Sequence, residues 1–133
     1  YPSGGKNFVD VRSVAVAICN AISLGQSGES YILADENMSF KEFAARLKQV
    51  TNRPSFQIQI PASILVFAGI LGSAARIIGI KAELNYHNAK ILTLKENISN
   101  KKAVDELRMP VTNINKSIVD SVKWFRENGY FHW

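Results

Sequence analysis

The sequence predicts a mixed α/β or α+β fold with few short strands and about five helices. Short runs of β-branched and aromatic residues occur among the first 60 residues, and longer segments repeat apolar residues at helical spacing. Gly, Pro or Asn follows most of these segments. The chain has 133 residues, of which 47% are hydrophobic and 20% charged, as in an ordinary globular domain. We therefore expect one domain over residues 1–133.

Strand and helix signals alternate in the first part of the chain. Short apolar runs predict strands at 8–11 and 30–34, with a helix at about 13–23 between them. Residues 56–60 alternate between glutamine and apolar side chains, which predicts a third, half-exposed strand.

The clearest helix signal begins at Ser39. Ser39 and Glu42 have the spacing of a capping box, and Met38 and Phe43 stand where a hydrophobic staple forms. We expect this helix to end at Asn52.

An apolar helix is predicted at 61–78, with Arg76 as its only charge. Pro61 and three glycines dilute the hydrophobicity of residues 60–80, so we expect a buried or interface helix and no membrane span. Close helix packing explains Gly69 and Gly72 better than phosphate binding does.

The last part of the sequence is predicted to be mainly helical. Helices are expected at 83–92, 100–108 and 115–128, and residues 92–98 as irregular chain or a short strand. Gly129 is a natural residue to follow the last helix.

Charge and cysteine content restrict the function classes. The net charge is +5, but the basic residues are scattered, which disfavours a nucleic-acid interface. Cys19 is the single cysteine, so an internal disulfide and a cysteine zinc cluster are excluded; we expect it to be buried. A single cysteine, with no internal disulfide, favours a cytoplasmic protein. His87 and His132 lack metal-ligand spacing, and we expect no metal site.

No catalytic motif is apparent from the residues alone. The sequence has no G-x-G-x-x-G, no Walker loop and no H-E-x-x-H. These observations describe a globular module without a recognisable active site.

Four segments together resemble one enzyme family. They are "NFVDVRSVA" (7–15), "GESYILADEN" (28–37), "KAVDEL" (102–107) and "WFRENGY" (124–130). In this order and spacing they resemble the C-terminal part of extended short-chain dehydrogenase/reductases, the NAD(P)-dependent epimerase/dehydratase family. The similarity is strongest to dihydroflavonol-reductase-like and nucleoside-diphosphate-sugar epimerase members.

The resemblance implies a fragment of a two-lobed enzyme. Such enzymes bind NAD or NADP on an N-terminal Rossmann domain and the substrate on a smaller C-terminal lobe. The Gly-rich loop and the catalytic Tyr-x-x-x-Lys pair precede the matching part, so no catalytic or cofactor-binding residue is expected here. The chain would be the substrate-binding portion, inactive alone and without bound cofactor. A free-standing binding or regulatory module with the same fold is the alternative.

The resemblance implies three candidate substrate-binding residues, Lys6, Asp10 and Arg12. Lys6 holds the place of a basic residue that contacts the substrate diphosphate, in a nucleotide sugar for example, but a solvated lysine is the competing interpretation. Arg12 is expected to form a salt bridge at the helix start rather than to touch substrate. Ser13 replaces the family's usual aspartate, and either residue is a fair N-cap. Arg108 stands where the family usually has glycine.

A truncated enzyme is expected to leave apolar surface uncovered. We expect such surface on helix 13–23, strand 30–34 and part of helix 61–78, and self-association of the chain as its consequence.

Overall fold

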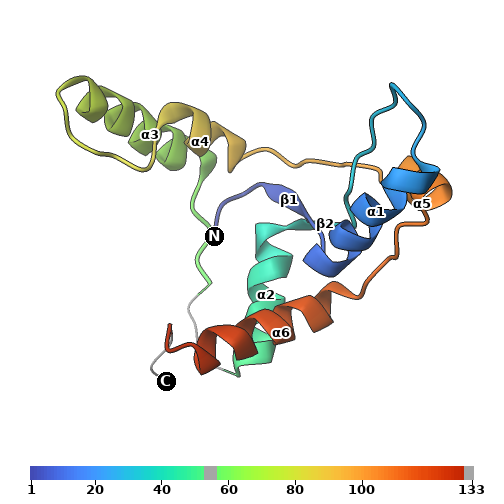
Figure 1. Cartoon of the computed structure of the whole chain (residues 1–133). Coiled ribbons are helices and arrows are strands. Elements are labelled where there is room, and N and C mark those ends of the chain that lie inside the picture. The colour runs from blue at the N-terminus through green and yellow to red at the C-terminus, as the bar shows by residue number, and fades with distance from the viewer. Residues whose placement is uncertain (53–56, 131–133) are drawn as a thin grey trace.

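The computed structural model describes residues 1–52 and 57–130 (Figure 1). In these ranges the chain forms six helices and one two-stranded sheet. The elements are β1 (Gly5–Phe8), α1 (Val11–Leu24), β2 (Glu36–Ser39), α2 (Phe40–Thr51), α3 (Ala62–Ile77), α4 (Tyr86–Ile91), α5 (Lys101–Leu107) and α6 (Ile114–Glu127). The predicted mixed fold with few short strands is confirmed.

The sheet is a small antiparallel pair, and it differs from the predicted strands. β1 pairs with β2 in the register Gly5 to Ser39 and Phe8 to Glu36. The first strand therefore begins three residues before the predicted 8–11. Lys95 adds one parallel bridge to Gly5.

The strand predicted at 30–34 is wrong. A strand needs a neighbouring backbone with which to exchange hydrogen bonds. The carbonyl of Ala34 instead accepts from the side-chain amide of Asn100 at 2.7 Å. Residues 57–60 of the third predicted strand are also irregular, and Phe56 lies outside the described residues.

Helix α1 begins at a different cap from the one expected. Its N-cap is Asp10, whose carboxylate accepts from the backbone N–H of Arg12. Ser13 is buried inside the first turn, and its hydroxyl lies 2.6 Å from that of Thr112. The aspartate precedes Ser13 and takes the cap, because it alone lies outside the helix with its oxygen facing the free amides.

Helix α2 has the predicted ends. The Ser39 hydroxyl accepts from the Glu42 N–H, and the Glu42 carboxylate accepts from the Ser39 N–H at 2.8 Å. Asn52 closes the helix in the left-handed conformation. Phe43 stacks on Phe8 with ring centroids 4.6 Å apart, which fixes α2 against β1.

Helices α3 and α4 form a tight pair, which we call the α3–α4 hairpin (residues 62–91). A Cβ atom at Gly69 would lie 2.6 Å from the Cβ of Ala89, and one at Gly72 would lie 1.9 Å from the carbonyl oxygen of Leu84. Close packing is therefore the confirmed reason for both glycines. In the described part of the chain no helix is long and apolar enough to cross a membrane.

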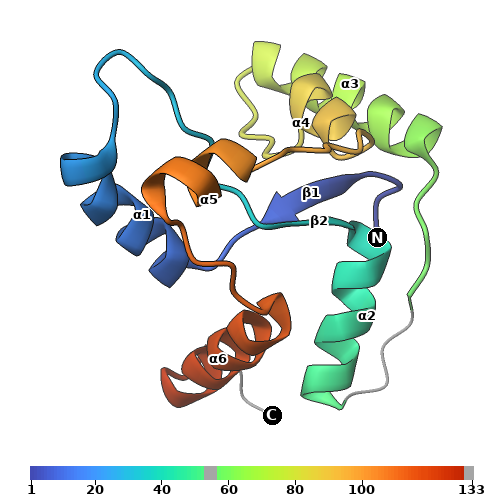
Figure 2. The ribbon, with the colours of Figure 1, turned by 90° about the vertical axis from the view of Figure 1, so that its right-hand side faces the viewer.

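Two small hydrophobic clusters hold the helices together. Met38, Ile114, Ile118 and Val122 join β2 to α6, with side chains of α2 packed against them. Ala17, Ala103 and Met109 join α1 to α5. Figure 2 shows the resulting arrangement, with the α1–α5 pair on one side of the strands, α2 and α6 below them, and the α3–α4 hairpin above.

Much apolar surface is uncovered, as predicted. The exposed large apolar side chains include Val11, Val16, Ile18 and Ile22 on α1, Ile32 in the following segment, and Ile64, Phe67, Ile70 and Leu71 on α3. Cys19 is also exposed, so its predicted burial is wrong. It follows the buried Ala17 by two residues, which places it on the outer side of α1.

Helix α5 ends in a conformation that suits glycine better than its actual residue. Arg108 is the C-cap, with φ 52° and ψ 40°. A side chain in the left-handed region has a steric cost that glycine avoids. This geometry explains the glycine of the family pattern. Gly129 follows the C-cap Asn128 of α6 with φ 73°, as expected.

The substitution Arg108→Gly is expected to raise the free energy of unfolding by roughly 0.5–1 kcal/mol, because it removes the left-handed strain. Urea unfolding measures the change. Asn52→Gly is the matched control, since Asn52 has φ 50° but asparagine tolerates this region better. If Asn52→Gly raises the free energy of unfolding as much as Arg108→Gly or more, left-handed strain at Arg108 is not the reason for the effect.

Candidate functional site

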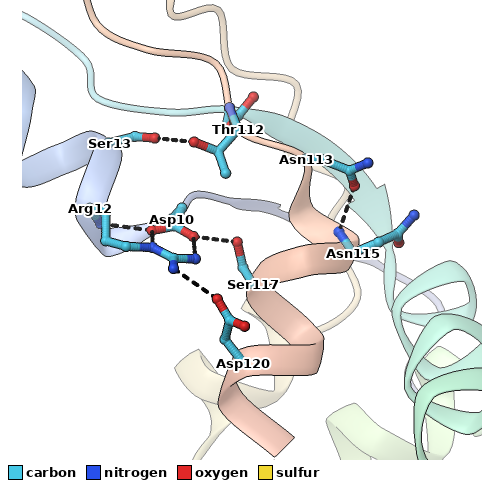
Figure 3. A network of polar contacts seen from close by, with 9 residues as sticks. Asp10, Arg12, Ser13, Thr112, Asn113, Asn115, Ser117 and Asp120 are labelled. Atoms are coloured by element: carbon cyan, nitrogen blue, oxygen red, sulfur yellow. Dashed lines mark hydrogen bonds and ion pairs between the residues drawn. The ribbon is translucent and has the colours of Figure 1, made fainter. Parts of the chain in front are cut away.

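The structure brings two of the three candidate residues together. Asp10 and Arg12 lie at the junction of β1 and α1, facing α6 (Figure 3). Lys6 lies inside β1 opposite Met38 and has a different partner. The three residues therefore do not form one cluster of contacts.

Asp10 is the buried centre of this junction. It is only 3% exposed. One carboxylate oxygen, Oδ1, accepts from the backbone N–H of Arg12 at 2.8 Å and from Arg12 Nε at 2.9 Å. The other, Oδ2, accepts from Arg12 Nη2 at 2.6 Å and from the Ser117 hydroxyl at 2.5 Å. The carboxylate is thus both a helix cap and one side of a bidentate ion pair.

Arg12 extends the junction to the surface of α6. Its Nη1 donates to Asp120 Oδ2 at 2.8 Å, so the guanidinium bridges two carboxylates. The predicted salt bridge at the helix start is confirmed, whereas contact of Arg12 with substrate stays a prediction. We call Asp10, Arg12, Ser117 and Asp120 the α1–α6 clasp.

The electrostatics of the clasp favour its ionised form. Hydrogen bonds from Arg12, and then from Ser117, hold the pKa of the Asp10 carboxyl well below its usual range, although burial acts in the opposite direction. The two carboxylates raise the pKa of the Arg12 guanidinium above its already high value. The pair therefore stays charged across the physiological pH range.

An open groove of about 520 Å³ lies beside the clasp. Asp10, Arg12 and Asp120 line it, together with Trp124 and Phe125. Two carboxylates face one guanidinium there, and the guanidinium is already hydrogen-bonded to both. An anionic ligand would have to displace a carboxylate from Arg12, so the clasp is better suited to holding α1 on α6 than to binding phosphate.

Lys6 has one carboxylate partner in the described structure. Its Nζ forms an ion pair with Glu96, and both side chains are partly exposed. Glu96 also lines a cleft of about 320 Å³ with Lys95, Ser39 and Asn37. Because both side chains are partly exposed, an anion can replace Glu96 at Lys6 without breaking a buried ion pair.

Asn37 orders the loop beside this cleft. Its side-chain oxygen accepts from the backbone N–H of Ile98 at 3.1 Å, and its amide donates to the carbonyl of Ile98 at 2.8 Å. Asn7 of β1 donates to the same oxygen at 3.0 Å. These contacts fix residues 95–98, and with them Glu96, against the sheet.

One spacing was overlooked in the sequence. Tyr86 and Lys90 on α4 match Tyr-x-x-x-Lys, although the pair was expected outside the chain. The ammonium of Lys90 lies 5.9 Å from the centroid of the Tyr86 ring, a cation–π arrangement. The glycine motif that binds a dinucleotide does not accompany this spacing in the sequence. Spacing alone does not assign these residues a catalytic role.

Metal-ligating side chains do not gather anywhere in the described residues. Within residues 1–52 and 57–130, no group of three His, Cys, Asp or Glu side chains could hold a metal ion.

The clasp predicts a specific acid sensitivity. Because the folded pKa of Asp10 is depressed, its stabilisation is complete above the usual value near 3.8 and is lost as the pH falls from there through the folded value. Asp10→Asn is expected to lower the free energy of unfolding by roughly 1–2 kcal/mol at pH 7 and to flatten its decline below pH 4.

Urea unfolding between about pH 2 and pH 7 tests this. Asp120→Asn is the matched control, because its carboxylate is exposed and leaves the helix cap intact. If the two variants lose equal stability at pH 7, Asp10 is not the centre of the clasp.

Comparison with known proteins identifies similar chains. The chain is 30% identical to a Synechocystis protein provisionally named dihydroflavonol 4-reductase, over 98% of this chain and 39% of that protein. It is 25% identical to sterol demethylase protein B of Methylococcus capsulatus, over 97% of this chain and 40% of that protein. It thus spans about two fifths of these curated relatives. No protein-family profile matches.

Two solved structures have the same fold over 99% of this chain. The crystal structure of gox2253 has a TM-score of 0.77 at 25% identity, and the match covers 40% of that chain. A nucleoside-diphosphate-sugar epimerase from Pseudomonas aeruginosa has a TM-score of 0.73 at 22% identity, with 39% of its chain covered. These matches agree with the resemblance drawn from the sequence: over nearly its whole length the chain is similar in sequence to a portion of a dihydroflavonol-4-reductase-like protein, and it has the fold of a portion of a nucleoside-diphosphate-sugar epimerase.

Proposed function

We propose that this chain is the C-terminal, substrate-binding portion of an NAD(P)-dependent nucleoside-diphosphate-sugar epimerase, dehydratase or related reductase. The observation that carries the proposal is similarity over almost the whole chain to only about two fifths of a reductase-like relative. We place the intact protein in the cytoplasm, in keeping with the single cysteine of this chain, which leaves it no internal disulfide.

The chemistry would be shared between two parts of the intact enzyme. The nicotinamide cofactor supplies hydride exchange when bound, but this sequence has no Gly-rich phosphate loop to hold it. We therefore assign the cofactor to another part of the intact protein. This portion binds and orients the substrate.

Lys6 is the proposed anion contact of the substrate site. Its ammonium is partly exposed, and Glu96 is an exchangeable partner. In this proposal the substrate diphosphate takes the place of the Glu96 carboxylate and gains a point charge from Lys6. Asp10 and Arg12 act indirectly, since the clasp fixes the end of the strand on which Lys6 lies.

The uncovered faces of α1 and α3 support a partner within the same enzyme. Ile22 is 88% exposed and Ile18 is 57% exposed, values that are unfavourable for a free-standing domain with a small core. A free-standing binding or regulatory module is the second candidate. Activity of the isolated chain with NAD(P) would contradict the main proposal, and Tyr86→Phe would then show whether the Tyr86–Lys90 pair is responsible.

In the intact enzyme, Lys6→Ala is expected to raise KM for a diphosphate substrate about tenfold, because one charge-assisted contact is lost. Steady-state kinetics measure it. Lys6→Arg keeps the charge and is expected to recover most of the affinity. Lys101→Ala on α5 is the matched control, since Lys101 is exposed and pairs with Asp105. An unchanged KM in Lys6→Ala removes the assigned role.

The isolated chain is expected to self-associate through α1. Light scattering at concentrations of roughly 10⁻⁴ M should give a mass above that of a monomer. Ile18→Gln with Ile22→Gln is expected to shift the chain towards the monomer, because the two substitutions remove exposed apolar surface that association would bury. Val119→Gln, at an exposed site on α6, is the control. A monomeric unmodified chain at this concentration contradicts the prediction.

A further inference from the structure

A small cleft lies where the first residues of the chain meet the start of α2. Its volume is about 150 Å³. The residues that line it are 1–4, Ser39, Lys41, Gln59 and Lys95, and we call it the lysine cleft. The backbone N–H of Phe40 donates to the carbonyl of Gly4 at 3.1 Å, and Figure 2 shows the N-terminus beside the first turn of α2. Two lysines from distant parts of the chain therefore face one small space.

Lys95 is held in this place by close backbone contacts. The N–H of Gly5 donates to the carbonyl of Leu94 at 2.9 Å. The N–H of Glu96 donates to the carbonyl of Gly5 at 3.4 Å, so Lys95 is paired with Gly5 in parallel. A Cβ atom at Gly4 would lie 2.4 Å from the carbonyl oxygen of Leu94. The missing side chain at Gly4 is therefore what lets the segment that carries Lys95 lie against the start of the chain.

The ammonium of Lys95 points away from the Lys6 site. Successive residues of an extended strand place their side chains on opposite faces. Lys95 is level with Gly5, whereas Lys6 is the next residue along β1 and pairs with Glu96. The lysine cleft and the Lys6–Glu96 pair are therefore two separate places on the molecule.

Neither ammonium of the lysine cleft has a carboxylate partner. Among residues 1–52 and 57–130, no ion pair includes Lys41 or Lys95. Glu42 is next to Lys41, but its carboxylate accepts from the N–H and from the hydroxyl of Ser39, both at 2.8 Å. The Glu96 carboxylate, next to Lys95, is already in an ion pair. The nearest carboxylates in the chain are therefore engaged elsewhere.

Lys41 occupies a position where a positive charge is unfavourable. It lies in the first turn of α2, two residues after the N-cap Ser39. The positive end of the helix dipole is at this turn, so a cation there costs free energy and an anion gains it. Hydrogen bonds from Ser39 lower the pKa of the Glu42 carboxyl, and the charge of Lys95 adds to this effect. The charge of Lys95 therefore acts on the same turn of α2 as that of Lys41.

The larger cleft of about 320 Å³, which Lys95 also lines, is less suited to an anion. The carboxylates of Glu42 and Glu96 line that cleft and would repel a negative ligand. In the described part of the chain, no carboxylate side chain lines the lysine cleft. An anion near Lys95 is therefore expected in the lysine cleft.

We propose that the lysine cleft binds a phosphoryl group, with Lys41 and Lys95 as its two cationic contacts. Two ammonium groups match the charge of a phosphoryl dianion, and lysine binds phosphate as a point charge. The Ser3 hydroxyl and the Gln59 amide are further donors in the cleft. Its volume equals that of about five waters at roughly 30 Å³ each, which suits one phosphoryl group. The proposal goes beyond the proposed function and does not depend on it, because Lys6 takes no part.

Titration of the whole chain with inorganic phosphate, followed by phosphorus NMR, tests the proposal. A Kd on the order of 1 mM is expected at low salt, rising with ionic strength. Lys41→Gln with Lys95→Gln is expected to weaken binding at least about tenfold, because both charge-assisted contacts are lost. Glutamine is a good helix former, and circular dichroism checks that helix content is unchanged.

A matched pair of substitutions separates the cleft from the general positive charge. Lys48→Gln with Lys116→Gln removes two exposed lysines at the end of α2 and the start of α6. Both double variants lower the net charge by two, from +5 to +3. Phosphate binding by this control is expected to change less than about twofold, because salt screens charges at such sites from the cleft.

A second ligand distinguishes two sources of the phosphoryl group. If uridine diphosphate binds at least about tenfold more tightly than phosphate, and loses this gain in the Lys41 and Lys95 variant, the cleft takes the phosphoryl group of a nucleoside diphosphate. Equal affinity for the two ligands assigns the cleft to phosphate alone. Lys6→Ala is expected to leave phosphate binding unchanged, whatever its effect on KM in the intact enzyme.

Three results would overturn the proposal. The first is a folded chain that does not bind phosphate. The second is an equal loss of binding in the Lys48 and Lys116 control, which would show attraction by net charge alone. The third is a loss in Lys6→Ala as large as that in the Lys41 and Lys95 variant, which would move the anion to the Lys6 site.

Discussion

The Asp10 carboxylate is the constraint on which the arrangement of helices depends. It follows β1 by two residues, caps α1, pairs with Arg12 and accepts from Ser117 on α6. One buried group therefore sets the direction in which the chain leaves the sheet and the position of the last helix. Burial of a carboxylate is unfavourable unless its oxygens are hydrogen-bonded and its charge is paired, and here both conditions are met.

Local signals predicted the helices well and the strands poorly. The capping box at Ser39 and Glu42 and the left-handed cap at Asn52 depend on neighbouring residues, so the sequence contains all the information. The segment 30–34 has strand-like residues but no backbone partner in the described chain, and it stays irregular. The contacts of Asp10 with Ser117 and of Ser13 with Thr112 join residues about a hundred positions apart, and no local pattern indicates them.

The candidate site was predictable only in part, for a related reason. Arg12 was expected in a salt bridge, and adjacent Asp10 is the obvious partner in sequence. The Glu96 partner of Lys6 comes from a loop that Asn37 positions, 90 residues along the chain from Lys6. The resemblance indicated the similar proteins more securely than any single side chain did, because it uses the order of several segments at once.

The α3–α4 hairpin also differs from the other helix pairs in how its contacts can form during folding. Its helices are separated by a short loop, so Gly72 reaches Leu84 after closure of only a dozen residues. Ala17 and Ala103 of the α1–α5 pair are 86 positions apart, and α6 reaches Asp10 from still further along the chain. Low contact order favours early formation. The hairpin is therefore suited to be the first tertiary unit of the chain, with the clasp closing last.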